Sequence, residues 1–475
     1  MSSYTVPFLI NGAEVRPDAT FDVVSPATGN VLHQCGIATE ADVSAAVDAA
    51  AKALPEWRNT TPGRRRDILL RAAEVFDKRR EELKLYMQDS VAAAPGWAGF
   101  NINTTIDFVK DVAGRVSTIT GTVPSLADPS LGAMVVKEPY GVVLAIAPWN
   151  APYILGTRSV LYPLAVGNTV VFKGSELAPR VFWAIADVFR EAGLPDGVLN
   201  FISTDPAHAA EVTSALIAHP DIKKINFTGS TAVGRIIGKL AGQHLKPVVQ
   251  ELGGKAPAIV WEDANLDIAA EECAEGAFKF SGQVCMSTEK ILVHKNISQA
   301  FRKQLLESIE KRHPSTGDAP VLINATGVDK VKKLLKDAVS KGGEVVTGNI
   351  DAEESSKTRL RPVVIAGVTP EMDIYKLESF GPSVSLIEIE TEEEALRIAN
   401  DTEYGLTSAV FTEDLRRGLR FAKGIESGAV HINNMTIHDE SVLAHGGCKA
   451  SGYGRFNATA GLEEWVRTKT ITWRS

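Results

Sequence analysis

Short runs of consecutive apolar residues alternate along the chain with longer segments whose apolar residues recur every three or four positions. The runs at 141–147, 168–172 and 224–227 each predict a buried strand. The longer segments between them predict amphipathic helices. Strands that alternate with helices in this way predict an α/β fold with a mostly parallel, doubly wound sheet that has helices on both faces.

Local signals place several helix ends. Helices are predicted over 39–54, 64–89, 181–192 and 229–240, and over a segment through Val160 and Leu164. Thr39 and Asp42 form a Thr-x-x-Asp start signal for the helix that they open. Gly193 and Pro195 form a stop signal after residue 192.

The second half of the chain shows the same alternation of strands and helices and predicts a second sheet. Strands are predicted at 256–260, 290–293, 384–389 and 429–432. Glu251 lies near the point where the strands of the first sheet give way to those of the second. The segment 311–320 is the best candidate for a flexible loop. A chain of 475 residues is also far longer than the roughly 250–300 residues at which single cores stop growing. Two or more domains are therefore expected.

Composition narrows the class of protein. Hydrophobic residues make up 44% and charged residues 23%, which is ordinary for a soluble globular protein. The net charge of −8 gives no basic surface for nucleic acid or an anionic membrane. We expect no secretory signal in the first eleven residues and no membrane span, because no apolar stretch approaches the roughly 18 residues that a span needs. The four cysteines form no CxxC pair and accompany no His cluster, so we expect no metal site and no disulfide framework. A reducing, cytoplasmic enzyme is the expectation.

One cysteine and one glutamate lie in settings that suggest catalysis. Cys285 ends the sequence Gly-Gln-Val-Cys, and Glu251 opens the sequence Glu-Leu-Gly-Gly-Lys. A free Cys is most often a small buried hydrophobe, and a lone Glu is most often a surface carboxylate. Together they suggest a nucleophile and a base. Asn150, at the end of an apolar run, could donate to the oxyanion that such a nucleophile creates.

Two further motifs suggest a dinucleotide site. The sequence Gly-Ser-Thr-Ala-Val-Gly at 229–234 follows a strand and opens a helix, where a phosphate can bind the helix N-terminus. It is not the G-x-G-x-x-G fingerprint, and alone it could be a plain turn. Lys173 and Glu176 follow another strand and could reach ribose hydroxyls, although a solvated pair is the alternative. A carboxylate at the ribose favours NAD over NADP.

These motifs, in this order, resemble those of the aldehyde dehydrogenase superfamily. Two more contribute: Glu-Ser-Phe-Gly-Pro at 378–382 and Gly-Gly-Cys-Lys-Ala-Ser-Gly-Tyr-Gly-Arg at 446–455. The resemblance runs from about residue 8 to residue 473.

The resemblance implies an architecture and a cofactor. It implies an NAD-binding domain over 1–120 and 140–250, an α/β catalytic domain over 251–445, and a small β oligomerisation element over 121–139 and 455–475. A homodimer or homotetramer is implied, with NAD as cofactor and NADP as a weaker alternative. The residues implied for cofactor binding are Ile146, Ala147, Pro148, Trp149, Lys173, Ser175, Glu176, Phe227, Gly229, Ser230, Val233, Gly234, Leu252, Glu378 and Phe380.

The resemblance also implies a mechanism. Cys285 attacks an aldehyde to give a thiohemiacetal, and the Cys285 backbone N–H and the Asn150 amide hold the oxyanion. Hydride transfer leaves a thioester, and Glu251 activates the water that releases the acid.

The substrate residues are similar to those of the branch that includes salicylaldehyde, vanillin and benzaldehyde dehydrogenases. Ala151, Arg158 and His445 stand where aliphatic relatives usually carry aromatic residues, and the stretch at 432–440 also looks like this branch. We expect Arg158 near a ring hydroxyl; its alternative is a structural ion pair with Asp439. The residues expected at the substrate are Trp97, Ala151, Tyr153, Arg158, Asp439 and His445.

Other readings stay open. The aldehyde could be aliphatic or a semialdehyde. The thioester could pass to coenzyme A, although that branch typically lacks the carboxylate that Glu251 supplies. A non-catalytic binding protein could keep the fold without the activity.

Overall fold

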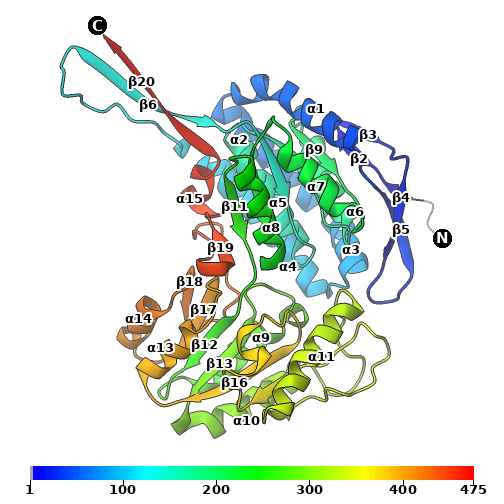
Figure 1. Ribbon diagram of the computed structural model, residues 1–475, viewed down its shortest axis with the longest axis vertical. Coiled ribbons are helices and arrows are strands. Elements are labelled where there is room, and N and C mark those ends of the chain that lie inside the picture. Colours follow the sequence, from blue (N-terminus) through cyan, green and yellow to red (C-terminus); the bar gives the residue numbers. More distant parts are fainter. Residues whose placement is uncertain (1–3, 475) are drawn as a thin grey trace.

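Most apolar strands lie in two large sheets, the first built mainly from the first half of the chain and the second from the second half (Figure 1). The computed structural model describes residues 4–474. Residues 1–3 and Ser475, at the ends of the expected NAD-binding domain and oligomerisation element, lie outside the described residues.

The first sheet has eight strands in the order β19-β11-β10-β7-β8-β9-β2-β3. The strands from β11 to β9 are parallel, and the outer ones are antiparallel. Every residue of β7, β8 and β9 is buried, as expected of runs that are covered on both faces. The bounds are β2 Phe8–Ile10, β3 Ala13–Val15, β7 Val142–Ile146, β8 Thr169–Lys173, β9 Leu199–Ile202, β10 Ile222–Thr228, β11 Val248–Glu251 and β19 Gly452–Tyr453. The three predicted strands are confirmed as β7, β8 and β10.

Helices cover both faces of this sheet. They are α1 Glu40–Arg58, α2 Pro62–Lys78, α3 Arg80–Val91, α4 Pro95–Arg115, α5 Pro152–Ala165, α6 Pro179–Glu191, α7 Ala209–Ala218 and α8 Thr231–Gln243. The predicted start of α1 is confirmed, because Thr39 and Asp42 exchange hydrogen bonds in a capping box. A separate three-stranded sheet near the N-terminus contains β1 Thr5–Val6, β4 Thr20–Val24 and β5 Val31–Gly36.

The prediction of one long helix over 64–89 is wrong. The segment forms two helices, α2 and α3, because Arg79 leaves the helical region at φ −94° and ψ 10°. The Arg79 guanidinium binds Asp187 of α6 at 2.7 Å and Glu82 at 3.0 Å, which anchors the break. Apolar periodicity could not reveal it, since both helices bury faces with the same spacing.

The second sheet has seven strands in the order β14-β15-β16-β13-β12-β17-β18, and only the β14 edge is antiparallel within the described residues. Its strands are β12 Ala256–Val260, β13 Thr288–His294, β14 Glu344–Thr347, β15 Val363–Ala366, β16 Ser383–Ile389, β17 Thr407–Phe411 and β18 Ala429–Ile432. Its helices are α9 Leu266–Phe278, α10 Ser298–Arg312, α11 Ala325–Ser340, α12 Asp373–Lys376, α13 Glu392–Asn400 and α14 Leu415–Gly424. Glu251 ends β11 of the first sheet, so it lies where the first sheet gives way to the second, as predicted.

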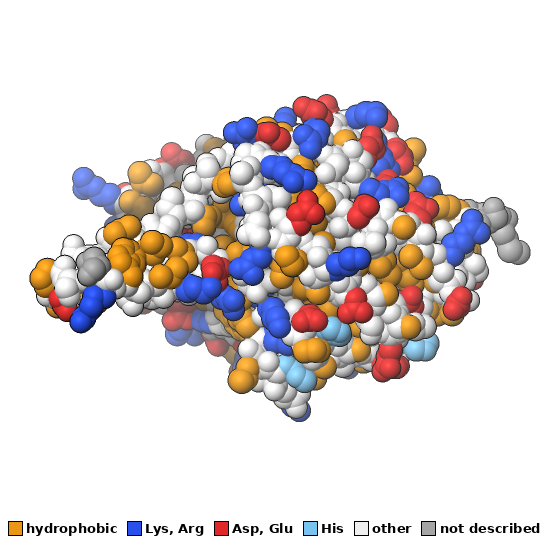
Figure 2. Space-filling model, turned by 90° about the horizontal axis from the view of Figure 1, so that it is seen from above, with side chains coloured by type: hydrophobic (Ala, Val, Ile, Leu, Met, Phe, Trp, Pro, Cys, Tyr) orange, Lys and Arg blue, Asp and Glu red, His pale blue; other side chains and the backbone are white. Residues whose placement is uncertain are grey.

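A two-stranded ribbon projects from the first sheet and carries the C-terminus at its tip (Figure 1). β6 Leu131–Pro139 pairs antiparallel with β20 Val466–Arg474, which follows the short helix α15 Ala458–Glu463. Met134, Ile471 and Trp473 are exposed on the ribbon, and Figure 2 shows apolar side chains gathered on this projection. Within residues 4–474, no helix has the length and apolar character needed to cross a bilayer.

Candidate active site

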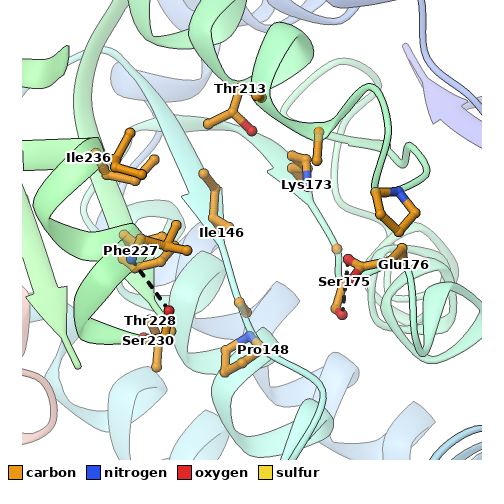
Figure 3. A pocket seen from close by; sticks show the side chains of 18 of the residues that line it. Ile146, Pro148, Lys173, Ser175, Glu176, Thr213, Phe227, Thr228, Ser230 and Ile236 are labelled. Carbon is orange, nitrogen blue, oxygen red and sulfur yellow. Dashed lines mark hydrogen bonds between the residues drawn. The ribbon is translucent and has the colours of Figure 1, made fainter. Parts of the chain in front are cut away.

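A cavity of about 470 Å³ opens where the parallel strands of the first sheet end, between α7 and α8. Lys173, Ser175 and Glu176 lie on one side of it, Phe227, Ser230 and Ile236 lie opposite, and Ile146 and Pro148 lie between (Figure 3). The carboxyl ends of strands in an open α/β sheet are the usual place for a ligand. The expected cofactor residues that line this cavity are Ile146, Ala147, Pro148, Trp149, Lys173, Ser175, Glu176, Phe227, Gly229, Ser230 and Val233. Thr213 of α7, which sequence reasoning missed, also lines it.

The start of α8 has the features of an anion site. Ser230 caps the helix, with its Oγ accepting from the Val233 N–H at 3.4 Å. Gly234 lies one turn further on and does not line the described cavities. A Cβ at Gly234 would lie 2.4 Å from Leu252 Cδ2, so the glycine lets α8 pack against Leu252.

Lys173 places a buried ammonium beside the first cavity. Its ammonium makes no hydrogen bond or ion pair with any residue in 4–474, and burial lowers its pKa although Glu176 opposes the shift. Ser175 donates to Glu176 at 3.4 Å. A buried ammonium beside a cavity is therefore available to a polar ligand.

A second cavity connects the first to the cysteine. Leu252, Glu378 and Phe380 line it with Cys285, together with Lys330, which sequence reasoning missed. Pro148, Trp149, Thr228, Gly229 and Ser230 line both cavities.

Two carboxylates, the half-buried Glu378 and the buried Glu289, shape the Glu-Ser-Phe segment beside this second cavity. Glu378 accepts from the Gly254 N–H at 2.8 Å, and burial raises its pKa to about 7. Glu289, itself paired with Lys255, accepts from the backbone N–H groups of Ser379 at 2.9 Å and Phe380 at 3.2 Å. Phe380 then lies edge-on to Trp149, with ring centroids 6.0 Å apart. Glu289 has no motif of its own, so sequence reasoning missed this role.

A tight turn presents Cys285. Phe280, Ser281 and Gly282 all have left-handed backbones, with φ of 48°, 59° and 69°. A Cβ at Gly282 would lie 2.2 Å from the Gly381 carbonyl oxygen, and one at Gly254 would lie 2.2 Å from that of Cys285. Both glycines are therefore required by close backbone approaches.

The Cys285 thiol lies 3.6 Å from Glu251 Oε1, so the predicted nucleophile and base are neighbours. Burial, and then the Glu251 charge, raise the pKa of the thiol well above its ordinary value. The pKa of Glu251 is lowered to about 2. Burial acts to raise this pKa, but the charges of Arg158 and His445 outweigh burial and lower it.

Two hydrogen-bond donors lie beside the sulfur. Asn150 donates one amide hydrogen to the Gln283 carbonyl at 3.0 Å, which leaves its second amide hydrogen. Trp97 Nε1 holds the Asn150 carbonyl at 3.1 Å. The Cys285 backbone N–H donates to no group within residues 4–474. These two donors can meet an oxyanion.

A third cavity lies on the other side of Cys285 and has mostly apolar walls. Trp97 stacks between Phe100 and Phe280, with centroids 5.4 Å and 5.7 Å away. Phe100 was missed, although it follows Trp97 by three residues on α4, a spacing that places both on one helix face. The residues that line this cavity include Trp97, Phe100, Ala151, Ile154, Arg158, Glu251, Val284, Cys285, Met286, Ile437 and Asp439.

Three of the expected substrate residues differ from expectation. Tyr153 is fully buried away from the cavity, because its hydroxyl donates to the Leu83 carbonyl at 2.7 Å. Arg158 binds Asp439 at 3.0 Å and also Glu251, so both Nη atoms are taken by carboxylates, as in the ion-pair alternative. His445 lies behind Glu251, with its Nε2 3.3 Å from Glu251 Oε1, and does not line the third cavity.

No group of three or more His, Cys, Asp or Glu residues within 4–474 is arranged to hold a metal ion.

Comparison with known proteins agrees with this geometry. The aldehyde dehydrogenase family model matches residues 14–471. The chain is 41% identical to a vanillin dehydrogenase of Pseudomonas fluorescens, over 98% of this chain and 97% of that protein. It is 39% identical to a salicylaldehyde dehydrogenase of Pseudomonas putida, over 95% and 94%. The structure of a salicylaldehyde dehydrogenase from Pseudomonas putida G7, complexed with salicylaldehyde, has a TM-score of 0.96 at 36% identity and covers 100% of this chain and 99% of that one. The chain belongs to the aldehyde dehydrogenase family, and it is an aldehyde-oxidising oxidoreductase.

Proposed function

We propose that this enzyme oxidises an aromatic aldehyde to its carboxylic acid, with NAD as the hydride acceptor. The observation that carries the proposal is the position of Cys285, which lines two cavities. One is the second cavity, which leads to the α8 N-terminus, and the other is the third cavity, called the aromatic cavity below because Trp97 and Phe100 line it. The similarity to enzymes named for vanillin and salicylaldehyde supports an aromatic substrate.

The first two cavities fit a nicotinamide dinucleotide. The unpartnered ammonium of Lys173 and the carboxylate of Glu176 would hold the adenosine ribose, and the α8 N-terminus would hold the phosphates. Glu378 and Phe380 would position the nicotinamide end near Cys285. Bound there, the cofactor would accept a hydride. On this basis we assign NAD binding to 1–120 and 140–250 and catalysis to 251–445.

The side chains then perform two half-reactions. The Cys285 thiolate adds to the aldehyde carbon, and the free amide hydrogen of Asn150 and the Cys285 N–H stabilise the oxyanion. Loss of hydride from that carbon leaves a thioester on Cys285. Glu251 Oε1, on the same side as the sulfur, is placed to take a proton from water, which hydrolyses the thioester.

The aromatic cavity would hold the ring of the substrate. The stacked face of Trp97 and the apolar side chains of Ile154 and Ile437 match a flat apolar group. Arg158 lines this cavity with both Nη atoms already paired, so its part here is to hold Glu251 and Asp439.

The ribbon of β6 and β20 supports an oligomer. A two-stranded ribbon is marginal alone in water, and this one exposes Met134, Ile471 and Trp473. We propose that 121–139 and 455–475 assemble a homodimer or homotetramer.

A substrate panel tests the proposal. Purified enzyme with NAD should form NADH and the free acid from hydroxylated and plain benzaldehydes with a higher kcat/KM than from acetaldehyde or succinic semialdehyde. Cys285→Ala should abolish this turnover while leaving NAD binding intact. A preference for the aliphatic aldehydes would refute the aromatic substrate, and turnover by Cys285→Ala would refute the nucleophile.

A further inference from the structure

His445 occupies a fixed place behind the catalytic pair. Its backbone forms two hydrogen bonds with Phe456, at 2.9 Å and 2.7 Å, and its imidazole is buried. Nε2 lies 3.3 Å from Glu251 Oε1, the same oxygen that lies 3.6 Å from Cys285 Sγ. Nδ1 lies 3.7 Å from Asp439 Oδ1. The sulfur, the carboxylate, the imidazole and a second carboxylate therefore follow one another in a line of contacts.

Arg158 fixes both carboxylates in this line. One of its Nη atoms binds Glu251 Oε2, and the other binds Asp439 Oδ2 at 3.0 Å. Asn457 donates to Asp439 Oδ1 at 2.6 Å. Because Arg158 takes Oε2, Oε1 of Glu251 remains for the thiol and His445. Nε2 of His445 makes no hydrogen bond within residues 4–474.

The thiol proton needs an acceptor other than Glu251. Burial and the Glu251 charge raise the pKa of Cys285, so the sulfur is protonated near neutral pH. Glu251 has a pKa of about 2 and cannot keep the proton that the thiol releases. A proton that leaves Sγ can be transferred through Oε1 of Glu251, but another group must hold it afterwards.

We propose that His445, held opposite Asp439, accepts through Glu251 Oε1 the proton that leaves Cys285. The S–H bond breaks, its electron pair stays on sulfur, and an N–H bond forms at Nε2 of His445. The transfer moves no net charge into or out of the buried cluster, so it avoids the cost of adding an unpaired charge there. His445 acts through Glu251 and is a positioning residue. The inference rests on the proposed role of Cys285 as the nucleophile.

The surroundings of His445 favour its charged form. The charged or titratable groups that face it are Glu251 from β11, Asp439 from the loop after β18, Arg158 from α5 and His431 from β18. Burial opposes the imidazolium, but the two carboxylates together raise the pKa of His445 above its ordinary value. A protonated His445 cannot accept, so Cys285 reactivity should rise with pH across a midpoint above the ordinary histidine value.

The test is alkylation of Cys285 by iodoacetamide in the full-length protein, followed by mass spectrometry of the peptide that contains Cys285, from mildly acidic to alkaline pH. His445→Gln can still donate to Glu251 but cannot take a proton. Its alkylation near neutral pH should be slower by on the order of a hundredfold, and the two profiles should converge at alkaline pH. His33→Gln is the matched control, because His33 is also buried but lies on β5, with its ring against Tyr4 and not against Glu251. It should follow the unmodified profile.

A His445→Gln profile that superimposes on the unmodified one would overturn the inference, as would an equal shift in His33→Gln. Alkylation needs neither aldehyde nor cofactor, so failure here is distinguishable from failure of the proposed oxidation, which the substrate panel measures.

Discussion

Glu251 has a different partner on each oxygen, since Oε1 faces Cys285 and His445 while Oε2 binds Arg158. Glu251→Gln keeps the shape and removes the base. We expect a burst of about one NADH per active site, slower than in the unmodified enzyme, followed by steady-state turnover reduced by roughly 10²–10⁴-fold. Stopped-flow absorbance of NADH measures both phases. Unchanged steady-state turnover would remove Glu251 from deacylation.

Arg158 gives a prediction that combines substrate range with stability. Arg158→Leu leaves Glu251 and Asp439 buried without their cation, which should cost about 3–5 kcal/mol of unfolding free energy at neutral pH. Activity should fall equally for hydroxylated and plain benzaldehyde. A larger loss for the hydroxylated substrate would show that Arg158 contacts the ring hydroxyl.

The stability effect of Arg158 should depend on pH with a definite sign. The pKa of Glu251 is lowered from 4.5 to about 2, so the paired carboxylate adds stability above pH 4.5 that is lost as the pH falls toward 2. Denaturant unfolding of the unmodified enzyme and of Arg158→Leu should show the difference in their unfolding free energies shrinking as the pH falls through this window. Arg302→Leu, which breaks a half-exposed pair with Glu344, should cost about 1 kcal/mol or less throughout.

Glu176 gives a prediction on cofactor choice. A carboxylate at the ribose repels a 2′-phosphate, so Glu176→Ser should narrow the NAD preference in kcat/KM by about tenfold, equivalent to about 1.4 kcal/mol. Glu211→Ser removes an exposed carboxylate of α7 and should leave the ratio unchanged. An NADP preference in the unmodified enzyme would contradict the assigned role of Glu176.

Among individual site residues, the sequence predicted those that lie in recognisable motifs. It missed those that only the fold brings into the site. Cys285 and Glu251 are 34 residues apart in the chain, and their motifs alone suggested the pair. Glu289 and Lys330 have no motif, and Tyr153 was misplaced because helix periodicity does not tell which face meets a cavity.

At the scale of elements, backbone contact between the turn after β11 and the cysteine turn controls the site. A Cβ on Gly254 would lie 2.2 Å from the Cys285 carbonyl oxygen, a backbone atom that cannot rotate away. Gly254→Ala should therefore displace Cys285 and lower kcat by about 10²-fold. NAD binding, followed by tryptophan fluorescence, should persist.

Gly242→Ala is the control for that substitution. A Cβ there meets nothing within 4 Å on α8, and removing a helical glycine should leave activity intact and stabilise by up to about 1 kcal/mol. Normal turnover by Gly254→Ala would mean that the turn tolerates the shift and that the close approach is not needed.

Elements with continuous apolar runs were the easiest to predict, because burial on both faces leaves a strand few alternatives. β7, β8 and β10 are the examples. The break at Arg79 could not be predicted, because its cause is an ion pair with Asp187, 108 residues away. Long-range pairs of this kind leave no local trace in the sequence.

The whole molecule has one feature that a single chain does not explain, the ribbon of β6 and β20. Its two strands come from distant parts of the chain. Within β20 only Val466 is buried, and the residues after it are exposed. The resemblance predicted that these segments would act together, and their pairing is observed, while the assembly that they serve is still a proposal.

Sedimentation velocity tests the assembly. The unmodified enzyme should sediment as a dimer or tetramer at micromolar concentration. Ile471→Asp places a charge among the exposed apolar residues of the ribbon and should shift the distribution toward monomer, because an unpaired charge is costly to bury at an interface. Leu245→Asp places the same charge on an exposed leucine after α8, outside the ribbon, and should not change the mass. A monomeric unmodified enzyme would refute the assembly. An oligomer that withstands Ile471→Asp would place the interface elsewhere, and the apolar exposure of the ribbon would then need another partner.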